Sequence, residues 1–203
     1  TKIRTELGWS PKVNFTDGVR KTVDATEAEF ARLRASVLEM GRVVPKAHGE
    51  LASYMETAGQ LGVPQAQLEK FTRTIADLDV ATNLAGEAGA SMLAQYANVT
   101  GMDLSNIDRL GSVIVDLGNN TATTELDIVN MGQRLAGMAG ILRLTDAQTM
   151  GLAATMASLG INAEAGGSAM SRVMQRMLQD VRKGGDELKK YAQVAGLSAQ
   201  AFA

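Results

Sequence analysis

A three-residue pattern recurs along this chain and divides most of it into short helices. Glycine is followed by a hydrophobic residue and then by a residue that favours a helix start, at Gly62, Gly101, Gly160 and Gly196. Glycine after a last helical turn adopts the left-handed conformation, and the hydrophobic residue folds back onto that turn. Pro, Asp, Asn or Ser then begins the next helix. The pattern predicts helices near residues 26–40, 46–61, 65–84, 87–99, 104–117, 122–142, 146–159, 163–183 and 185–195.

Other signals mark the remaining helix boundaries. Thr26 and Glu29 form a capping box at the start of the first helix, and Gly41 is expected to end it. Variant joints lie at 118–121 and 144–146. Because the connections are short, successive helices should pack as antiparallel or steeply angled neighbours. We therefore predict an all-α fold, a multi-helix array of short helices joined by glycine-containing turns.

The composition agrees with a helical fold and excludes several kinds of functional site. Aromatic residues make up only 4% of the 203 residues, which argues against a β-sandwich or barrel. The absence of cysteine excludes disulfides, thiolate zinc sites, iron–sulfur clusters and thiol nucleophiles. Glycine and methionine are abundant, with 21 and 11 residues, so helix joints and adaptable packing surfaces are expected.

The sequence contains none of the common catalytic motifs for phosphate binding, dinucleotide binding, serine hydrolysis or zinc proteolysis. The single histidine, His48, has no positioned partner, so a solvent-facing side chain is favoured over a metal ligand or base. Asp77 and Asp79 point to different sides of a helix and cannot form an acid/base pair. Asp103, five residues before Asp108, is better explained as an N-cap. We predict no catalytic, cofactor-binding or metal-binding residues and no enzymatic activity.

The formal net charge of −2 conceals an uneven distribution of charge. Residues 1–25 carry five Lys and Arg against three Asp and Glu, residues 26–171 carry nine against sixteen, and residues 172–190 carry six against three. The basic residues of the last segment are Arg172, Arg176, Arg182, Lys183, Lys189 and Lys190. One interpretation is a basic strip that binds nucleic acid or a lipid surface. A solvated helix face is favoured over it, because carboxylates are interspersed and few aromatic residues are present.

The helix predicted over 163–183 has the clearest periodicity. Its apolar residues, spaced i, i+3, i+4, i+7, i+8 and i+11, are Met170, Val173, Met174, Met177, Leu178 and Val181. An ordinary core or a seam between identical helices is favoured over an adaptable methionine-rich binding groove. Small residues dominate 136–140 and 151–157, where they predict close approach of helix backbones, completed by a neighbouring subunit or segment.

Two uncharged runs, 88–102 and 147–163, fall short of the roughly 20 apolar residues that a membrane-spanning helix needs. Buried helices are favoured, with a membrane-active or translocated helical module as the rival interpretation. No secretion signal is recognisable, and both ends are expected to be cuts through a longer polypeptide. We divide the chain into an atypical N-terminal segment (1–24), a helical core (25–183) and a helical continuation (184–203).

Four stretches share the spacing of one protein family, namely 18–30, 40–45, 54–62 and 154–170. The most specific is the last, in which a helix ends in Leu-Gly-Ile and glycine, small and hydrophobic residues begin the next helix. On these stretches, residues 19–177 resemble the core region of phage tail tape measure proteins. Residues 7–23 separately resemble the C-terminal tail of nucleotide-sugar epimerases and dehydratases, but no glycine-rich cofactor loop accompanies them.

The tape measure resemblance implies a structural role in the virion. Such proteins are long helical chains that occupy the lumen of the growing tail, limit its length and leave ahead of the DNA at infection. The implied partners are further copies of the chain, tail tube proteins, tail-tip or baseplate proteins and tail assembly chaperones, without specific nucleic-acid binding. Membrane contact during ejection is compatible with this role. The implied location is the tail lumen, after assembly in the bacterial host cytoplasm.

Overall fold

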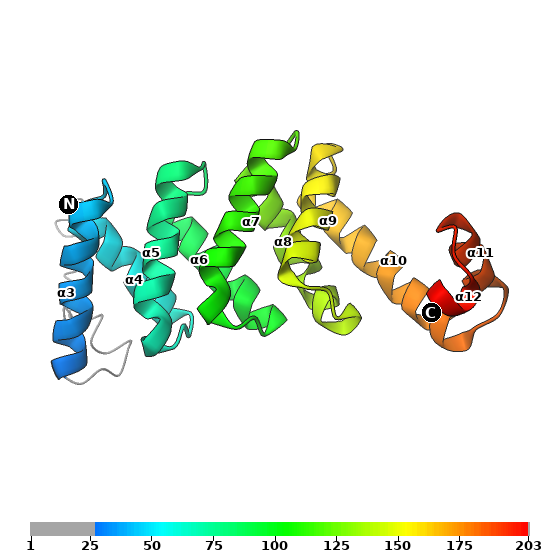
Figure 1. The fold of residues 1–203 in the computed structure, drawn as a ribbon, viewed down its shortest axis with the longest axis horizontal. Helices are drawn as coiled ribbons and strands as arrows, with labels where there is room; N and C mark the ends of the chain where they lie inside the picture. Colours follow the sequence, from blue (N-terminus) through cyan, green and yellow to red (C-terminus); the bar gives the residue numbers. More distant parts are fainter. Residues whose placement is uncertain (1–26, 203) are drawn as a thin grey trace, which may run out of the picture. The chain divides into compact units, whose positions relative to one another are not determined.

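The computed structural model describes residues 27–202, and in this range it contains helices and no strand (Figure 1). The α-helices are α3 (Glu27–Val43), α4 (His48–Gln60), α5 (Gln65–Ala81), α6 (Gly86–Thr100), α7 (Ile107–Asn120), α8 (Glu125–Leu142), α9 (Asp146–Ser158), α10 (Ala163–Lys183), α11 (Asp186–Val194) and α12 (Ala199–Phe202). A 3-10 helix, η1 (Leu104–Asn106), precedes α7. The predicted all-α fold is confirmed. The capping residue Thr26 and the predicted segment 1–24 lie outside the described residues.

The recurring glycine joints have the predicted conformation. Gly62, Gly101, Gly160 and Gly196 adopt φ values of +85°, +70°, +73° and +69°. After Gly62, the next backbone amide donates to the carbonyl of Ala58 at 3.0 Å, which is the hydrogen bond of a Schellman helix end. Each joint therefore ends one helix and reverses the chain within a few residues.

Polar side chains cap the helical segments after three of these joints, and Pro64 precedes the helix after the fourth, as the sequence predicts. Asp103 accepts the backbone N–H of Ser105 at 2.9 Å, and Asn162 accepts that of Glu164 at 2.9 Å. Ser198 accepts a backbone N–H of α12 at 3.1 Å. Each cap satisfies an amide that has no partner inside its helix.

Several predicted boundaries differ from the structure by three residues. α5 ends at Ala81 rather than at 84, and α7 runs from Ile107 to Asn120, after η1, rather than over 104–117. Two further differences have identifiable reasons. Gly41 does not end α3, which continues to Val43. A side chain at Gly41 would overlap the ring of His48, so this glycine permits a close approach rather than a helix end. α8 begins later than predicted, because Thr124 caps it by accepting the N–H of Asp127 at 3.2 Å.

The end of α8 places a residue other than glycine in the left-handed region. Arg143 has φ +55° and ψ +35°, a conformation that costs an L-residue about 1–2 kcal/mol. We expect Arg143→Gly to raise the free energy of unfolding of its part of the chain by about 1 kcal/mol, measured by urea denaturation followed by hydrogen exchange. The matched control is Gly160→Ala at a left-handed joint, which should be destabilising. A loss of stability in Arg143→Gly would contradict this explanation.

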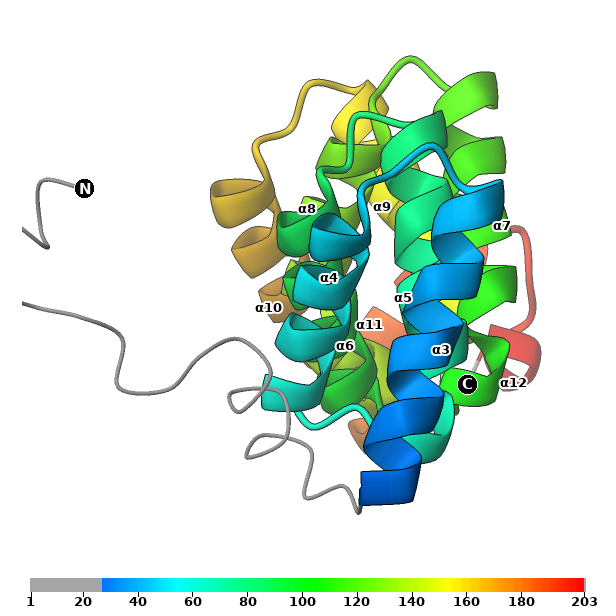
Figure 2. The same cartoon turned by 90° about the vertical axis from the view of Figure 1, so that its left-hand side faces the viewer.

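The described residues form two compact units. The first comprises 27–97 with 103–112, and the second comprises 98–102 with 113–202. In the first unit, α4 packs against both α3 and α5, and Figures 1 and 2 show these three helices side by side. In the second unit, α8 packs against both α9 and α10, and α11 packs against α10 and α12. No helix within 27–202 combines the length and apolar character needed to cross a bilayer.

Each unit has its own apolar core. In the first, the most completely buried large side chains include Leu51, Phe71 and Leu93, each with no exposed surface. In the second, Ile128 and Met131 are equally buried. Burial of such side chains contributes about 1.5–3 kcal/mol each, so helix packing supplies stability that short isolated helices lack.

Small residues act as predicted at some helix contacts and not at others. Within the predicted stretches, Ala136, Ala139, Ala153 and Ala154 are buried. Gly132 lies outside those stretches, and a Cβ there would lie 2.8 Å from the Met150 sulfur, so this glycine allows close packing of α8 on α9. The prediction is wrong for Gly137, Gly140 and Gly151, because a Cβ at these positions would meet no atom within 4 Å. These three glycines lie away from the helix contacts within the described chain, where alanines are buried instead.

One buried hydroxyl in α5 has no hydrogen-bond partner among the described residues. Thr72 is fully buried, and its Oγ1 is unsatisfied. We expect Thr72→Val to raise the free energy of unfolding of the first unit by about 1 kcal/mol, because valine removes the desolvated hydroxyl at nearly constant volume. Thr74→Val is the control and should not stabilise, since Thr74 Oγ1 donates to the Lys70 carbonyl at 3.0 Å. Equal effects of the two substitutions in urea denaturation would refute the explanation.

Candidate functional site

A cluster of three polar side chains lies at the junction of several helices in the first unit. The Tyr54 hydroxyl donates to Asp79 Oδ2 at 2.5 Å, and Lys46 Nζ lies 2.5 Å from the same oxygen. Tyr54 is buried, whereas the Lys46 and Asp79 side chains keep 20% and 13% of their surface exposed. The three residues come from α4, from α5 and from the joint before α4, so the cluster ties three segments together.

The pKa values in this cluster follow from its geometry. Burial raises the pKa of Tyr54 above its usual range, and its hydrogen bond to Asp79 adds to the effect. Burial alone would raise the pKa of Asp79, but hydrogen bonds from Lys46 and Tyr54 lower it below its ordinary value. The hydrogen bond to Asp79 raises the pKa of Lys46. Tyr54 is therefore a neutral donor, and Asp79 is a carboxylate held by two donors.

Close packing keeps the Tyr54 ring in place. Gly86, the first residue of α6, faces this ring, and a side chain at Gly86 would overlap it. A backbone hydrogen bond from Gly86 also reaches Asp79. Because Asp79 already accepts from several groups, the cluster is suited to fixing the positions of α4, α5 and α6 rather than to proton transfer.

The acidic residues and the histidine considered in the sequence lie in different places. Asp77 forms a surface ion pair with Arg73 at 3.0 Å, whereas Asp79 lies in the cluster, so the two carboxylates do point to different sides. Asp108 forms an ion pair with Lys70 at 2.8 Å. His48 is exposed, and its ring occupies the space where a side chain at Gly41 would lie. Sequence reasoning missed the cluster because Asp79 and Tyr54 are 25 residues apart and share no motif.

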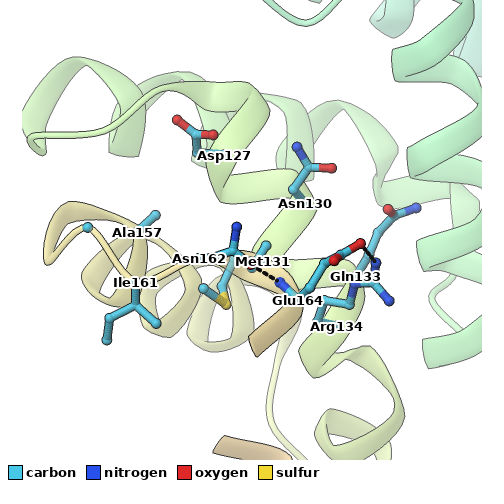
Figure 3. Close-up of a pocket in the computed structure, with 11 residues that line it drawn as sticks. Asp127, Asn130, Met131, Gln133, Arg134, Ala157, Ile161, Asn162 and Glu164 are labelled. Atoms are coloured by element: carbon cyan, nitrogen blue, oxygen red, sulfur yellow. Dashed lines mark hydrogen bonds and ion pairs between the residues drawn. The ribbon is translucent and has the colours of Figure 1, made fainter. Parts of the chain in front are cut away.

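The second unit contains an open pocket of about 590 Å³ between α8 and the joint that leads from α9 to α10 (Figure 3). Met131 is fully buried beneath it, and the polar side chains that line it are Asp127, Asn130, Gln133, Arg134, Asn162 and Glu164. Arg134 Nη2 lies 3.3 Å from Glu164 Oε1.

The side chains that line the pocket are mostly polar. It contains no histidine, serine, threonine or cysteine. The carbonyl oxygen of one of its amides, Asn162, already accepts the backbone N–H groups of Glu164 and Ala165. Among residues 27–202, no three His, Asp or Glu side chains are grouped closely enough to hold a metal ion. The pocket thus offers hydrogen-bonding groups without a nucleophile paired to a base.

The charged residues of 172–190 are exposed except for Asp180, which is half-buried and accepts the Tyr191 hydroxyl at 3.0 Å, and several of them are paired locally. Lys189 lies 3.0 Å from Asp186, and Lys190 lies 2.7 Å from Glu187. Arg172 donates to a carbonyl of its own helix at 3.3 Å. Pairs of this kind on an exposed helix contribute little to stability, and the geometry is that of a solvated face.

The apolar stripe of α10 is the feature that differs most from its sequence interpretation. Val173 is 51% exposed, and the other five stripe residues are half-buried. None of the six is buried, so the prediction of an ordinary core is wrong for the chain alone. The alternative of a seam between identical helices stays a prediction.

Comparison with known proteins identifies the family. A family model described as phage-related minor tail protein matches residues 34–203, which include all the described helices from the second turn of α3 onward. No curated protein matches the chain, and no solved structure does. The match also covers 184–203, where the tape measure resemblance is weaker. Because it spans most of the sequence, the chain belongs to the phage-related minor tail protein family.

Proposed function

We propose that this chain is part of a tail tape measure protein, which sets tail length during assembly and is released ahead of the DNA. The observation that carries the proposal is the family match over residues 34–203, which gives a role in the phage tail. The spacing at 154–170, with its Leu-Gly-Ile helix end, supports the narrower tape measure role. In this role the chain acts by binding and by its dimensions, without catalysis.

The proposed location is the lumen of the virion tail, after assembly in the host cytoplasm. The proposed partners are the inner wall of the tail tube, the tail-tip or baseplate proteins and the tail assembly chaperones. Short helices with glycine joints suit such a confined space, because each joint changes the direction of the chain within a few residues. Short helices also unfold locally at low cost, which would ease passage out of the tail.

The experiment follows the chain in phage particles that carry its gene. Intact virions are treated with protease and then triggered to eject DNA, and peptides from residues 27–202 are quantified by mass spectrometry, with a tail tube protein as the retained control. We expect the chain to be protected in intact tails and lost from tails after ejection. A chain that is digested in intact virions, or that stays in emptied tails, would overturn the lumen role.

Tail length is measured separately by electron microscopy. An in-frame duplication of residues 34–203 in the intact gene should lengthen the tails, because a longer ruler permits more tube to polymerise. The substitution Gly49→Ala, at a helical position with open space around it, is the control and should leave tail length unchanged. Tails of normal length from the duplication would contradict the ruler role even if the chain lies in the lumen.

A further inference from the structure

Two consecutive glycines join α10 to α11, and Figure 1 shows the chain turning sharply between these helices. Gly184 has φ +68° and ψ −163°, and Gly185 has φ +93° and ψ −157°. Both pairs of angles lie in a region of backbone space that is essentially restricted to glycine. The turn from α10 into α11 therefore depends on both residues being glycine.

α11 is held against α10 by few contacts. The Tyr191 hydroxyl donates to Asp180 Oδ2 of α10 at 3.0 Å. Within α11, Ala192 is the one buried residue, whereas Leu188 and Tyr191 are half-buried and the other six residues are exposed. Because burial of so small a side chain contributes little free energy, an undocked form of α11 is accessible to the folded chain.

The residue spacing of the α10 stripe continues through the joint into α11. Part of the stripe is spaced by four, three and four positions, namely Met170, Met174, Met177 and Val181. The same alternation then leads to Gly184, Leu188, Tyr191 and Ala195. Alternation of this kind places residues on one side of a single helix. The two helices therefore share the apolar pattern of one longer helix, which the glycines interrupt.

The charged residues on either side of the joint have the spacing of a continuous helix as well. Arg182 and Lys183 end α10, and Asp186 and Glu187 begin α11. In an uninterrupted helix, each of these basic residues would lie four positions before one of the acidic residues, which is the spacing of ion pairs along a helix. A continuous helix would therefore gain local pairs across the joint.

The folded-back form and a continuous helix exclude each other. Eleven residues separate Asp180 from Tyr191, so in a continuous helix they would lie about 16 Å apart along the axis. A tyrosine and an aspartate side chain do not bridge that distance. The hydrogen bond between them therefore marks the folded-back form.

We propose that α11 and α12 form a movable arm with two positions and that Gly184 and Gly185 are its hinge. In the docked position, Tyr191 holds the arm to Asp180. In the extended position, α10 continues through the joint, and the apolar stripe gains Leu188 and Tyr191. The glycine pair sets the balance, because glycine accepts the turn and disfavours the helix interior. This inference rests on the second unit alone and does not depend on the proposed tape measure role.

The test measures the distance between two spin labels in the 203-residue chain by double electron–electron resonance. Because the sequence contains no cysteine, Gln175→Cys with Gln193→Cys provides two specific labelling sites, both exposed. A continuous helix would place these residues about 27 Å apart. The docked arm brings residue 193 back toward α10, so we expect mainly a shorter distance when the hinge is unchanged.

Substitution of the hinge should move the arm. Gly184→Ala with Gly185→Ala should shift most of the population to about 27 Å, because alanine is disfavoured in the turn and favoured in a helix. The matched control, Gly137→Ala with Gly140→Ala, changes two exposed glycines of α8 with open space around them and should leave the distances unchanged. Unchanged distances in the hinge variant would overturn the proposal. A broad distribution with loss of helical circular dichroism would also overturn it.

A second variant tests the latch without altering the hinge. Tyr191→Phe keeps the ring and removes the hydrogen bond to Asp180, so the population at the longer distance should rise about fivefold. Distances equal to those of the chain with Tyr191 would show that this hydrogen bond does not hold the arm.

Discussion

Gly86→Ala is expected to lower the free energy of unfolding of the first unit by about 2–4 kcal/mol. A Cβ at this position would overlap the ring of Tyr54, which is 4% exposed and closely packed. Relief of the overlap requires either displacement of α6 or loss of the hydrogen bond from Tyr54 to Asp79. Overpacking of this kind costs about 1–3 kcal/mol, and a buried hydroxyl without its partner adds about 1–3 kcal/mol.

Gly49→Ala provides the control for the intrinsic effect of the substitution. Gly49 lies in α4, and a Cβ there would meet no atom within 4 Å, so alanine should be neutral or stabilise by up to about 1 kcal/mol. Urea denaturation, with hydrogen exchange assigned to residues 48–97, measures both variants on the first unit. Equal stability of Gly86→Ala and wild type would show that Tyr54 has an alternative position.

Asp79→Ala is expected to lower the free energy of unfolding of the first unit at pH 7 by about 2–4 kcal/mol. The substitution removes the common acceptor of Tyr54 and Lys46, and the tyrosine hydroxyl then stays buried without a partner. Asp77→Ala is the control two residues away on the same helix. Its exposed pair with Arg73 should contribute no more than about 0.5 kcal/mol.

The effect of Asp79→Ala should depend on pH in a defined direction. The pKa of Asp79 is lower in the folded state than in the unfolded state. Its contribution to the free energy of unfolding is therefore present above the unfolded pKa of about 3.9 and is lost as the pH falls through the folded pKa. Folding raises the pKa of both Tyr54 and Lys46, so their contributions are present below about pH 10 and are lost as the pH rises further. The wild-type and Asp79→Ala chains should therefore converge in stability below about pH 4. A constant difference from pH 7 to pH 2 in urea denaturation would contradict the ionic role of Asp79.

Helix boundaries were largely predictable, because the signals that set them are local. The left-handed conformation of Gly62 and Gly160 can be predicted from a sequence window of three residues. The caps at Asp103 and Asn162 can be predicted from the same short windows. The failure at the start of α8 has a local cause, the cap at Thr124, whereas the failure at Gly41 has a tertiary one. Gly41 resembles a helix end in the sequence, but its missing side chain is explained by a residue of the next helix.

The polar cluster and the pocket were not predictable from the sequence. Asp79 and Asp77 are the same residue type on the same helix, and their side chains point in different directions. Only the Asp79 side chain points toward α4, where Tyr54 donates a hydrogen bond to it. Asn130 of α8 and Asn162 before α10 both line the pocket. The spacing of residues within either helix does not predict that these two amides lie near one another. Contacts between distant segments depend on packing angles, which local patterns do not specify.

Local signals are enough to specify that residues 27–202 form short α-helices and where most of them end, because caps and left-handed glycines act within one turn of backbone. The sequence also carries the spacing that resembles a tape measure core. Helix packing is needed to know which small residues lie at helix contacts, which carboxylate is held by a tyrosine and a lysine, and that the apolar stripe of α10 is not fully buried. Those outcomes depend on which faces meet, and the apolar period of α10 is the same whether its face is buried or exposed.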